Sequence, residues 1–450
     1  MQAADHSFYI ETLGCAKNQV NSEVMVASLE SRGWTRRDEP EAADVIIVNT
    51  CGFIQPAKEE SIETVLSMRA EYPRARIVMA GCMTQRYASE LHADLNEVDA
   101  FFGNRAPAGI ADFLETRPWE ARDEAARAVS LPGNDDGLYL RNTLFSFRGS
   151  AYLKIAEGCD NRCSFCAIPL IRGRHRSRPP EDLEAELRHL LSRGVREVNL
   201  IAQDLASYGR DGRTPGLVEL LRRLLSVEED FYLRMLYIHP ERFPRALLRL
   251  CAEDPRVLPY FDLPMQHADD EVLRAMARSG TTADYLGLVE EIRAALPDAV
   301  LRTSLLVGYP GETPEAFNRL LDFQEKAAFG VFTYSPEEGT AAYRRHEDSV
   351  EPEAESRREI LEEAQLPITQ GQLDRFVGRP MRVLIEEEVE GEELAIGRGF
   401  PHAPEVDGLV VVRTGGKKLA AGDLVETRIL RRNGIDLEAH IPGSAGAAER

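Results

Sequence analysis

The residues of this sequence best suited to chemistry are its seven cysteines, six of which form two groups of three. The first group, Cys159, Cys163 and Cys166, has the spacing C-x3-C-x2-C. Three thiolates this close in sequence can bind three corners of a cubane iron–sulfur cluster, which leaves one iron without a protein ligand. That open iron can bind a small molecule that chelates through an amine and a carboxylate. The alternatives are a zinc site, for which no fourth ligand has suitable spacing, a disulfide and chance spacing.

The second group is spread along the chain, so its spacing alone is uninformative. Cys15, Cys51 and Cys82 each follow the carboxyl end of a predicted strand. In a parallel sheet those ends share one edge, where ligands bind. We therefore expect the three thiols to converge on a second cluster that also has an open iron. The alternative is three buried apolar cysteines, which are common in protein cores.

Alternating strands and helices predict the parallel sheet that would position the second group. This N-terminal α/β domain is expected over residues 7–117, with strands at 8–13, 45–49 and 76–80 and helices at 20–29 and 57–68. Weak periodicity and several Pro, Gly and Asp residues predict a connector over residues 118–144.

A second alternating block predicts a central domain over residues 145–375. Its length is too short for a closed eightfold barrel, so we expect an open, partial (β/α)6 barrel. The expected strands are 151–155, 197–201, 233–238, 260–263, 301–307 and 330–334. The clearest helices are expected at 182–191 and 283–296, and a charged helical segment at 351–376.

The end of the chain has a different pattern, in which short strands are separated by Gly and Pro. This pattern predicts a small all-β barrel over residues 376–442. Its expected strands are 382–385, 395–398, 409–413 and 424–430. The fold class is therefore α/β, with a parallel α/β domain, a partial barrel and a small β-barrel in that order.

The composition limits the partners and the compartment. The 450 residues include 75 acidic and 54 basic side chains, a net charge of −21, which argues against a broad nucleic-acid surface and fits a basic partner. No apolar run approaches the ~20 residues of a membrane span, so no membrane partner is predicted. The N-terminus lacks the features of a signal peptide. These observations predict a cytoplasmic protein, a compartment where disulfides are rare.

The first cysteine group follows the first strand of a six-unit βα block and has Phe165 just before its last cysteine. This arrangement resembles the radical S-adenosylmethionine (SAM) superfamily. With the second group and the C-terminal β-barrel, the chain resembles the methylthiotransferase family from about Phe8 to Ile441. The resemblance implies an N-terminal domain with an auxiliary cluster, a central radical SAM domain, a C-terminal TRAM domain, two [4Fe–4S] clusters and SAM.

The resemblance also implies roles for the cysteines. Cys159, Cys163 and Cys166 would ligate the cluster whose electron cleaves SAM to methionine and a 5′-deoxyadenosyl radical. The other three cysteines would ligate the auxiliary cluster, which carries the sulfur to be inserted, methylated by a first SAM. A second SAM would supply the radical that abstracts hydrogen from the substrate carbon. Because cofactors do this chemistry, no side chain is assigned as a catalytic residue.

Local signatures indicate the branch of the family. Gly14–Asn18 (GCAKN) matches the GCxKN of the branch that modifies an aspartate of ribosomal protein uS12, whereas the branch that modifies adenosine in tRNA has GCxMN. Asn49–Ile54 (NTCGFI) also lacks the arginine of the tRNA branch, NTCxxR. Two positions depart from the expected pattern, Asn21 in place of Asp and Leu205 in place of Thr. The resemblance thus implies 3-methylthio-aspartate as the product.

Five residues are expected to contact SAM: Phe165, Gln203, Asp204, Gly308 and Gly311. Phe165 is assigned by analogy, as a neighbour of the adenine. Gln203 and Asp204 follow the second barrel strand and are assigned to the SAM amino group, with loop capping as the alternative. Gly308 and Gly311 allow close backbone approach to a ligand, with a plain strand-to-helix turn as the alternative.

Other polar groups have open assignments. Arg172, Arg174, Arg176 and Arg178 form the one dense basic run, which could hold the SAM carboxylate, RNA or the substrate aspartate, or be a solvated loop. His267 is expected to be structural, and the seventh cysteine, Cys251, is expected to be an inert core residue on a helix.

The C-terminal barrel provides evidence on the substrate. Residues 376–441 contain nine basic and twelve acidic side chains, and six glutamates gather in one predicted hairpin: Glu386, Glu387, Glu388, Glu390, Glu392 and Glu393. A tRNA-binding barrel needs a basic face, whereas an acidic one suits a basic ribosomal protein. A solvated hairpin face is the alternative for the acidic run.

The expected partners are therefore uS12, alone or in the small subunit, a reductant such as flavodoxin or ferredoxin, and a sulfur donor. We expect a monomer and no tRNA. The rival functions are a tRNA adenosine methylthiotransferase and a non-enzymatic iron–sulfur electron carrier.

Overall fold

The computed structural model describes residues 6–116, 127–134, 137–325, 330–346 and 353–443. The chain divides into two compact units, each described by itself below. The first comprises residues 1–145, 154–186 and 335–349, and the second comprises residues 146–153, 187–334 and 350–450. The predicted boundaries at 117, 144 and 375 stay predictions.

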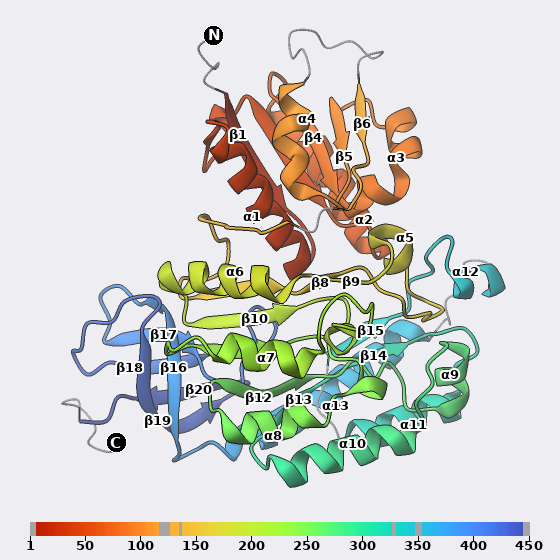
Figure 1. The fold of residues 1–450 in the computed structure, drawn as a ribbon. Helices are drawn as coiled ribbons and strands as arrows, with labels where there is room; N and C mark the ends of the chain where they lie inside the picture. Colours follow the sequence, from red (N-terminus) through yellow and green to blue (C-terminus); the bar gives the residue numbers. More distant parts are fainter. Residues whose placement is uncertain (1–5, 117–126, 135–136, 326–329, 347–352, 444–450) are drawn as a thin grey trace. The chain divides into compact units, whose positions relative to one another are not determined.

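The first unit is built on a six-stranded parallel sheet with the order β2-β1-β3-β4-β5-β6 (Figure 1). The strands are Ser7–Thr12, Thr35–Arg36, Val45–Thr50, Arg76–Gly81, Ala100–Phe102 and Ala128–Ser130, numbered β1 to β6 in chain order. The three strands that the sequence predicted are confirmed. The sixth strand lies inside the predicted connector, of which residues 117–126 and 135–136 fall outside the described part of the chain.

Both faces of this sheet are covered, which explains why its strands are apolar at successive positions. Val45 and Ile47 pack in one core cluster with side chains of α1 and α4, whereas Ile46 and Val48 pack in a second cluster with side chains of α2 and α3. These helices are Ala16–Ser31, Gln55–Glu71, Cys82–Asp94 and Ile110–Glu115, numbered α1 to α4 in chain order. The two predicted helices of this region are confirmed, each longer than expected.

Later segments of the chain complete the first unit. The short strands β8 (Ala156–Glu157) and β9 (Arg176–Ser177) pair antiparallel. The chain between them contains the first cysteine group and α5 (Ile168–Arg172). Helix α12 (Ala341–His346) also belongs to this unit. Helix α6 (Pro180–Ser192) follows and continues into the second unit.

The second unit contains the open central sheet, in the order β13-β12-β11-β10-β7, and a separate parallel pair, β14-β15. These strands are β7 Ser150–Lys154, β10 Glu197–Ile201, β11 Tyr232–Met235, β12 Val257–Asp262, β13 Val300–Arg302, β14 Ser304–Val307 and β15 Gly330–Thr333. The open, partial barrel is confirmed. The prediction of one strand over 301–307 is wrong, because Thr303 interrupts it and its Oγ1 accepts a 2.9 Å hydrogen bond from the Met265 amide.

The helices of the second unit follow its strands as βα repeats require. They are α7 Leu217–Leu225, α8 Ala246–Glu253, α9 Asp270–Ala275, α10 Thr282–Ala295, α11 Pro314–Gln324 and α13 Ala354–Asp374. A capping box at Thr281 and Asp284 begins α10. The predicted helices at 182–191 and 283–296 are confirmed as α6 and α10. The predicted helical segment at 351–376 is confirmed as α13, except that its residues 351–352 lie outside the described part of the chain.

The second unit ends in a closed barrel with the order β16-β17-β18-β20-β19, as the sequence predicted. Its strands are β16 Pro380–Glu388, β17 Leu394–Arg398, β18 Val410–Arg413, β19 Leu424–Asn433 and β20 Asp436–His440, of which the last was not predicted. A buried ion pair joins the barrel to the central sheet, because Arg398 and Arg234 both donate to the Glu197 carboxylate, at 2.6 and 2.7 Å.

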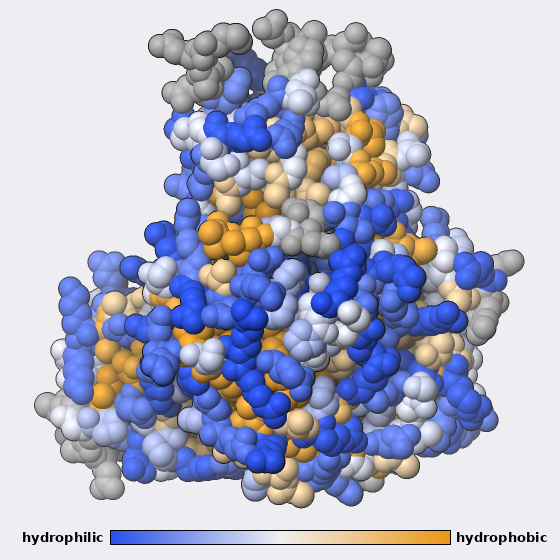
Figure 2. Space-filling model, viewed as in Figure 1, coloured by the Kyte–Doolittle hydropathy of each residue, from blue (hydrophilic) through white to orange (hydrophobic). Residues whose placement is uncertain are grey.

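The visible face of the molecule is mostly hydrophilic, and its apolar side chains are interrupted by polar ones (Figure 2). Among the described residues, no helix combines the length and the hydropathy that crossing a lipid bilayer requires.

Candidate functional site

The second cysteine group lies at one edge of the first unit's sheet. Cys15 is the N-cap residue of α1, Cys51 follows β3, and Cys82 is the first residue of α3, directly after β4. Strands β1, β3 and β4 are neighbours and parallel, so their carboxyl ends meet at this edge. Electrostatic interactions join all three thiols to one another, as the sequence predicted from the strand ends.

Glycine allows the backbone to close around these thiols. Gly14 has φ +90°, and a Cβ at this position would lie 2.8 Å from Cys51 Cβ and 3.1 Å from its sulfur. A Cβ on Gly52 would lie 2.7 Å from Met83 Cα. The loops after β1 and β3 therefore form a cradle that larger residues would fill.

Amide side chains line the inner side of the cradle. Asn18 donates from Nδ2 to the carbonyl oxygens of Leu13 and Thr50 at 2.9 and 3.0 Å. Asn104 donates from Nδ2 to the Cys82 sulfur at 3.3 Å, and that thiol donates to Asn18 Oδ1 at 3.3 Å. Both asparagines are fully buried, so the sulfur of Cys82 has fixed polar neighbours.

Arg172 is the functional neighbour that sequence reasoning missed. The sequence placed it in a basic run of open assignment, whereas the structure buries it against the second cysteine group. Its Nη2 donates to the Cys82 sulfur at 3.1 Å and to Asn18 Oδ1 at 2.7 Å. Its Nη1 donates to both carboxylate oxygens of Glu157 at 3.1 Å. The sequence signals were its place shortly after Cys166 and its position in Ile168–Gly173, a stretch that resembles the family pattern.

The rest of the basic run separates into different environments. Arg178 is buried and pairs with Glu186 at 2.7 Å, and its guanidinium stacks over the Tyr139 ring. Arg174 is 89% exposed and pairs loosely with Asp160 at 3.4 Å. The run is thus partly structural and partly solvated.

The first cysteine group lies on the loop between β8 and α5. Gly158 begins this loop with φ +78°, where a Cβ would collide with the carbonyl oxygen of Arg174. The Cys159 amide donates to Gly173 O at 3.1 Å, and the Cys166 amide donates to Cys163 O at 3.1 Å. The three cysteines are half-buried, so a ligand can reach them.

The surrounding charges favour thiolates unequally in the second group. Desolvation raises the pKa of Cys15, but the positive charges of Lys17 and Arg172 outweigh it and lower that pKa below its ordinary value. Desolvation and the neighbouring Cys82 raise the pKa of Cys51 to about 12. Burial raises the pKa of Cys82, which Arg172 opposes. Deprotonation of the last two thiols therefore needs a cation such as iron.

The donor sets fit clusters better than single ions. Each group offers three thiols, and a cluster spreads its ligands over separate corners. In the part of the chain that the structure describes, no three His, Cys, Asp or Glu side chains lie close enough together to hold one metal ion. Around Cys82 the buried cations Arg172 and Lys154 share one carboxylate, Glu157, so an anionic group is needed for balance. A cubane cluster with three thiolates supplies such a group.

The five expected SAM contacts lie on loops after strands. Phe165 is half-buried between Cys163 and Cys166. Asp204, after β10, is buried, and its carboxylate accepts from the Ala206 amide at 2.9 Å and pairs with Arg242 at 2.6 Å. The capping alternative is therefore observed for Asp204. The SAM contacts of Phe165, Gln203 and Asp204 stay predictions.

The two expected glycines lie on the loop between β14 and α11, with φ +74° at Gly308 and +87° at Gly311. The Gly308 amide donates to the Glu312 carboxylate, and Thr313 caps α11. Their SAM contacts also stay predictions. The same carboxylate contacts His267, which is fully buried 3.2 Å from Glu312, and its structural role stays a prediction.

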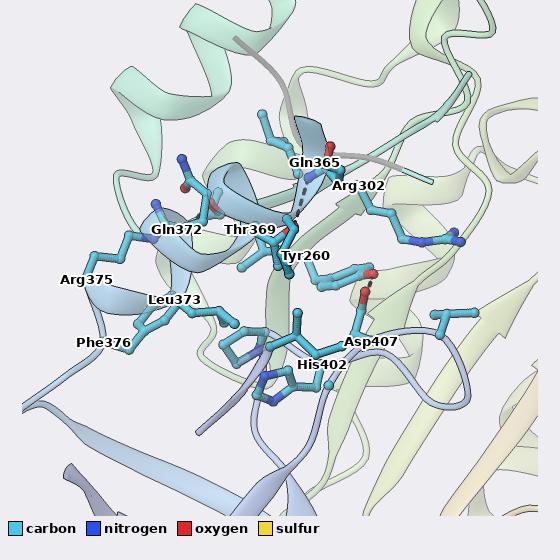
Figure 3. A pocket seen from close by; sticks show the side chains of 18 of the residues that line it. Tyr260, Arg302, Gln365, Thr369, Gln372, Leu373, Arg375, Phe376, His402 and Asp407 are labelled. Atoms are coloured by element: carbon cyan, nitrogen blue, oxygen red, sulfur yellow. Dashed lines mark hydrogen bonds between the residues drawn. The ribbon is translucent and has the colours of Figure 1, made fainter. Parts of the chain in front are cut away.

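A separate cavity of about 300 Å³ lies in the second unit, between α13 and the barrel loop at 401–408 (Figure 3). Tyr260 donates to Asp407 across it at 2.7 Å, and His402 forms part of its wall. None of the expected cluster or SAM residues lines this cavity. It is distinct from the cysteine sites.

Comparison with known proteins covers nearly the whole chain. Three family models match: Uncharacterized protein family UPF0004 at residues 7–103, the Radical SAM superfamily at 153–323 and the TRAM domain at 377–441. Among solved structures, the radical SAM methyltransferase TsrM from Kitasatospora setae has a TM-score of 0.57 at 16% identity and covers 76% of each chain. The cobalamin-dependent enzyme OxsB has a TM-score of 0.51 at 12% identity, over 80% of this chain and 56% of its own. These structures show the fold.

Relatives in sequence are much more similar. The ribosomal protein uS12 methylthiotransferase RimO of Treponema denticola is 41% identical over 95% of this chain and 98% of its own length. The RimO of Aquifex aeolicus is 42% identical over 95% of both chains, and that of Myxococcus xanthus is 41% identical over 97% of this chain and 91% of its own. Identity at this level over 95–97% of the chain decides the branch. The chain belongs to the RimO family of ribosomal protein uS12 methylthiotransferases.

Proposed function

We propose that this chain transfers a methylthio group to ribosomal protein uS12, at the β-carbon of an aspartate. The observation that carries the proposal is the presence of two three-cysteine groups in one compact unit of a chain that matches RimO of Treponema denticola over 95% of its length. A rival tRNA substrate is not favoured by the family match, and the radical SAM domain argues against a mere electron carrier.

The cofactors are two [4Fe–4S] clusters and SAM, which this family uses. When bound, these cofactors would supply three things: the methyl group, the sulfur, and the electron whose transfer to SAM gives a carbon radical. We assign Cys159, Cys163 and Cys166 to the cluster that binds SAM, and Cys15, Cys51 and Cys82 to the auxiliary cluster. Phe165, Gln203, Asp204, Gly308 and Gly311 are our candidates for SAM contacts.

The protein's own residues position and shield these groups. Asn104 and Arg172 donate hydrogen bonds to the Cys82 sulfur, Asn18 Oδ1 accepts one from its thiol, and together they exclude water from it. The Ala342 amide of α12 donates to Ser164 O at 2.8 Å, which fixes the loop between Cys163 and Cys166. The acidic hairpin of the C-terminal barrel is our candidate for the surface that binds the basic substrate protein.

The partners beyond uS12 follow from the same chemistry. A low-potential reductant such as flavodoxin or ferredoxin supplies electrons, and a sulfur donor replaces the sulfur that each turnover consumes. We propose that the chain works as a monomer in the cytoplasm, without binding tRNA.

One experiment tests the function. The reconstituted full chain is incubated with uS12, SAM and dithionite, and uS12 is analysed by mass spectrometry. We expect a methylthio group on one aspartate and 5′-deoxyadenosine in the mixture. Modification of tRNA instead of uS12 would favour the rival enzyme, and absence of 5′-deoxyadenosine would favour an electron carrier.

A second experiment tests the ligand assignment. Replacing either cysteine group by alanine should lower the bound iron from about eight to about four atoms per chain, because each [4Fe–4S] cluster holds four. Unchanged iron after replacement of a whole group contradicts the assignment of that group.

A further inference from the structure

Arg172 is almost completely buried, and both of its terminal guanidinium nitrogens have hydrogen-bond partners. Its side chain is 2% exposed, and its donors reach the Cys82 sulfur, Asn18 Oδ1 and both oxygens of Glu157. A buried guanidinium in such a fixed geometry cannot move away from the sulfur without breaking several hydrogen bonds.

Arg172 also links the two cysteine groups along the chain. It is the last residue of α5, which begins just after Cys166, whereas its carboxylate partner Glu157 lies two residues before Cys159. Its sulfur partner, Cys82, belongs to the other group. One side chain therefore connects the loop of the first group to a proposed ligand of the second.

Among the described residues, the contacts of Arg172 and its buried neighbour Lys154 place more positive than negative charge beside Cys82. Lys154 is also buried, and its Nζ donates to Glu157 at 2.8 Å and to Asn21 Oδ1 at 2.6 Å. The described contacts of the two cations include a single carboxylate, that of Glu157. Because an uncompensated buried charge is costly, the excess positive charge favours added negative charge at Cys82.

We propose that Arg172 is a positioning residue that raises the reduction potential of the auxiliary cluster through its hydrogen bond to the Cys82 sulfur, and that Glu157 opposes it. This inference rests on the proposed function, which assigns Cys82 to that cluster. Reduction adds one electron to the cluster, so a nearby cation and a donor to a ligand sulfur stabilise the reduced state. Glu157 is the negative charge that partly offsets both cations.

The test is a reduction titration of the auxiliary cluster alone. The full chain carries Cys159→Ala, Cys163→Ala and Cys166→Ala, is reconstituted with iron and sulfide, and is titrated with dithionite while the reduced cluster is followed by electron paramagnetic resonance. At a given solution potential, Arg172→Gln should raise the ratio of oxidised to reduced cluster at least tenfold over that of the parent protein. For this one-electron couple, the change equals a midpoint lower by about 59 mV.

Two further variants make the result specific. Glu157→Gln should shift the midpoint in the opposite direction, and Arg172→Lys should give a smaller decrease, because it keeps the charge but loses the planar fork. Arg174→Gln is the matched control, since it removes the same charge from an exposed position in the same run. It should leave the midpoint unchanged.

The outcomes separate the inference from the proposed function. If the parent protein binds no four-iron cluster, the assignment of Cys15, Cys51 and Cys82 fails. If the cluster forms and Arg172→Gln has the parent's midpoint, or if Glu157→Gln shifts it in the same direction, the role of Arg172 is refuted. Should Arg172→Gln fail to bind iron, Arg172→Lys and Glu157→Gln decide by the signs of their shifts.

Discussion

The Arg86 guanidinium donates a 2.6 Å hydrogen bond to the carboxylate of Glu337, which comes from a distant part of the chain. Lys58 donates to the same oxygen at 3.1 Å, and Glu337 is only 1% exposed. Arg86 also donates to Gly52 O, next to Cys51, at 3.0 Å. The segment that begins at Ser335 is thus fastened to the helices that follow Cys51 and Cys82.

We therefore expect Glu337→Gln to destabilise the first unit. The substitution leaves two largely buried cations without their carboxylate, which costs about 3 kcal/mol of unfolding free energy. The melting temperature of the first unit, followed by calorimetry, should fall by roughly 6 °C. Glu338→Gln is the control, because this exposed neighbour contacts Arg86 through its backbone carbonyl. Equal melting temperatures for the two variants would show that the ion pair contributes little.

Cys251 provides a second prediction, since it is the one cysteine outside the two groups. It is 9% exposed on α8, and burial raises the pKa of its thiol to about 12. Cys251→Ala should therefore leave the bound iron and the absorption of the clusters unchanged. The lost packing should cost only about 1 kcal/mol. A loss of about four iron atoms in this variant would mean that Cys251 is a ligand after all.

The sequence was sufficient for the features that depend on short patterns. The run VIIVN is apolar at every position because Val45 and Ile46 face opposite sides of a sheet that is covered on both. That pattern placed β3, and the positions of three cysteines after strands predicted one shared edge. The spacing of Cys159, Cys163 and Cys166 needed no tertiary information.

Features that depend on distant partners were not predictable in the same way. Arg172 acquires its role from Cys82 and Asn18, which belong to another part of the sequence. Strand β6 has three residues and exists because it pairs with β5, so no local pattern indicates it. The break at Thr303 reflects a change of partner strand, from β12 for β13 to β15 for β14, which hydrophobic periodicity does not record.

The acidic hairpin leads to a third prediction, about substrate binding. Strands β16 and β17 form the expected antiparallel hairpin. Glu386 pairs with Arg398 at 2.6 Å, whereas Glu387, Glu388 and Glu390 are exposed. Changing these three to lysine should raise the KM for uS12 about tenfold at low salt and leave kcat unchanged, because long-range attraction mainly speeds encounter.

Salt provides the control for this prediction. At an ionic strength of about 0.5 M the difference between the two proteins should largely disappear, since surface charges are then screened. The release of 5′-deoxyadenosine without uS12 should be equal throughout. A tenfold change in kcat with unchanged KM would mean that the hairpin does not bind substrate.

The last prediction concerns stability in acid and the imidazole of His402. This side chain is buried in the wall of the cavity in Figure 3, and neither ring nitrogen has a hydrogen-bond partner. Desolvation and the nearby Arg234 and Arg398 lower its pKa to about 3. An unfolded chain binds this proton below about pH 6.5, whereas the folded chain does not until about pH 3. His402 therefore does not lower the free energy of unfolding above about pH 6.5. Below that pH it lowers the free energy of unfolding progressively until the pH reaches about 3.

His402→Gln removes this contribution because glutamine does not titrate. Between pH 7 and pH 5 the free energy of unfolding should fall by about 2 kcal/mol more for the wild-type chain than for the variant. It is measured for each protein by thermal unfolding and compared with the value at pH 8. Glu197 does not interfere in this window. Burial raises the pKa of Glu197, but Arg398 and Arg234 outweigh burial and lower that pKa to about 2. The contribution of Glu197 to the free energy of unfolding therefore changes only below about pH 4.5. If the two proteins differ in free energy of unfolding by the same amount from pH 7 to pH 5, His402 is protonated equally in the folded and the unfolded chain.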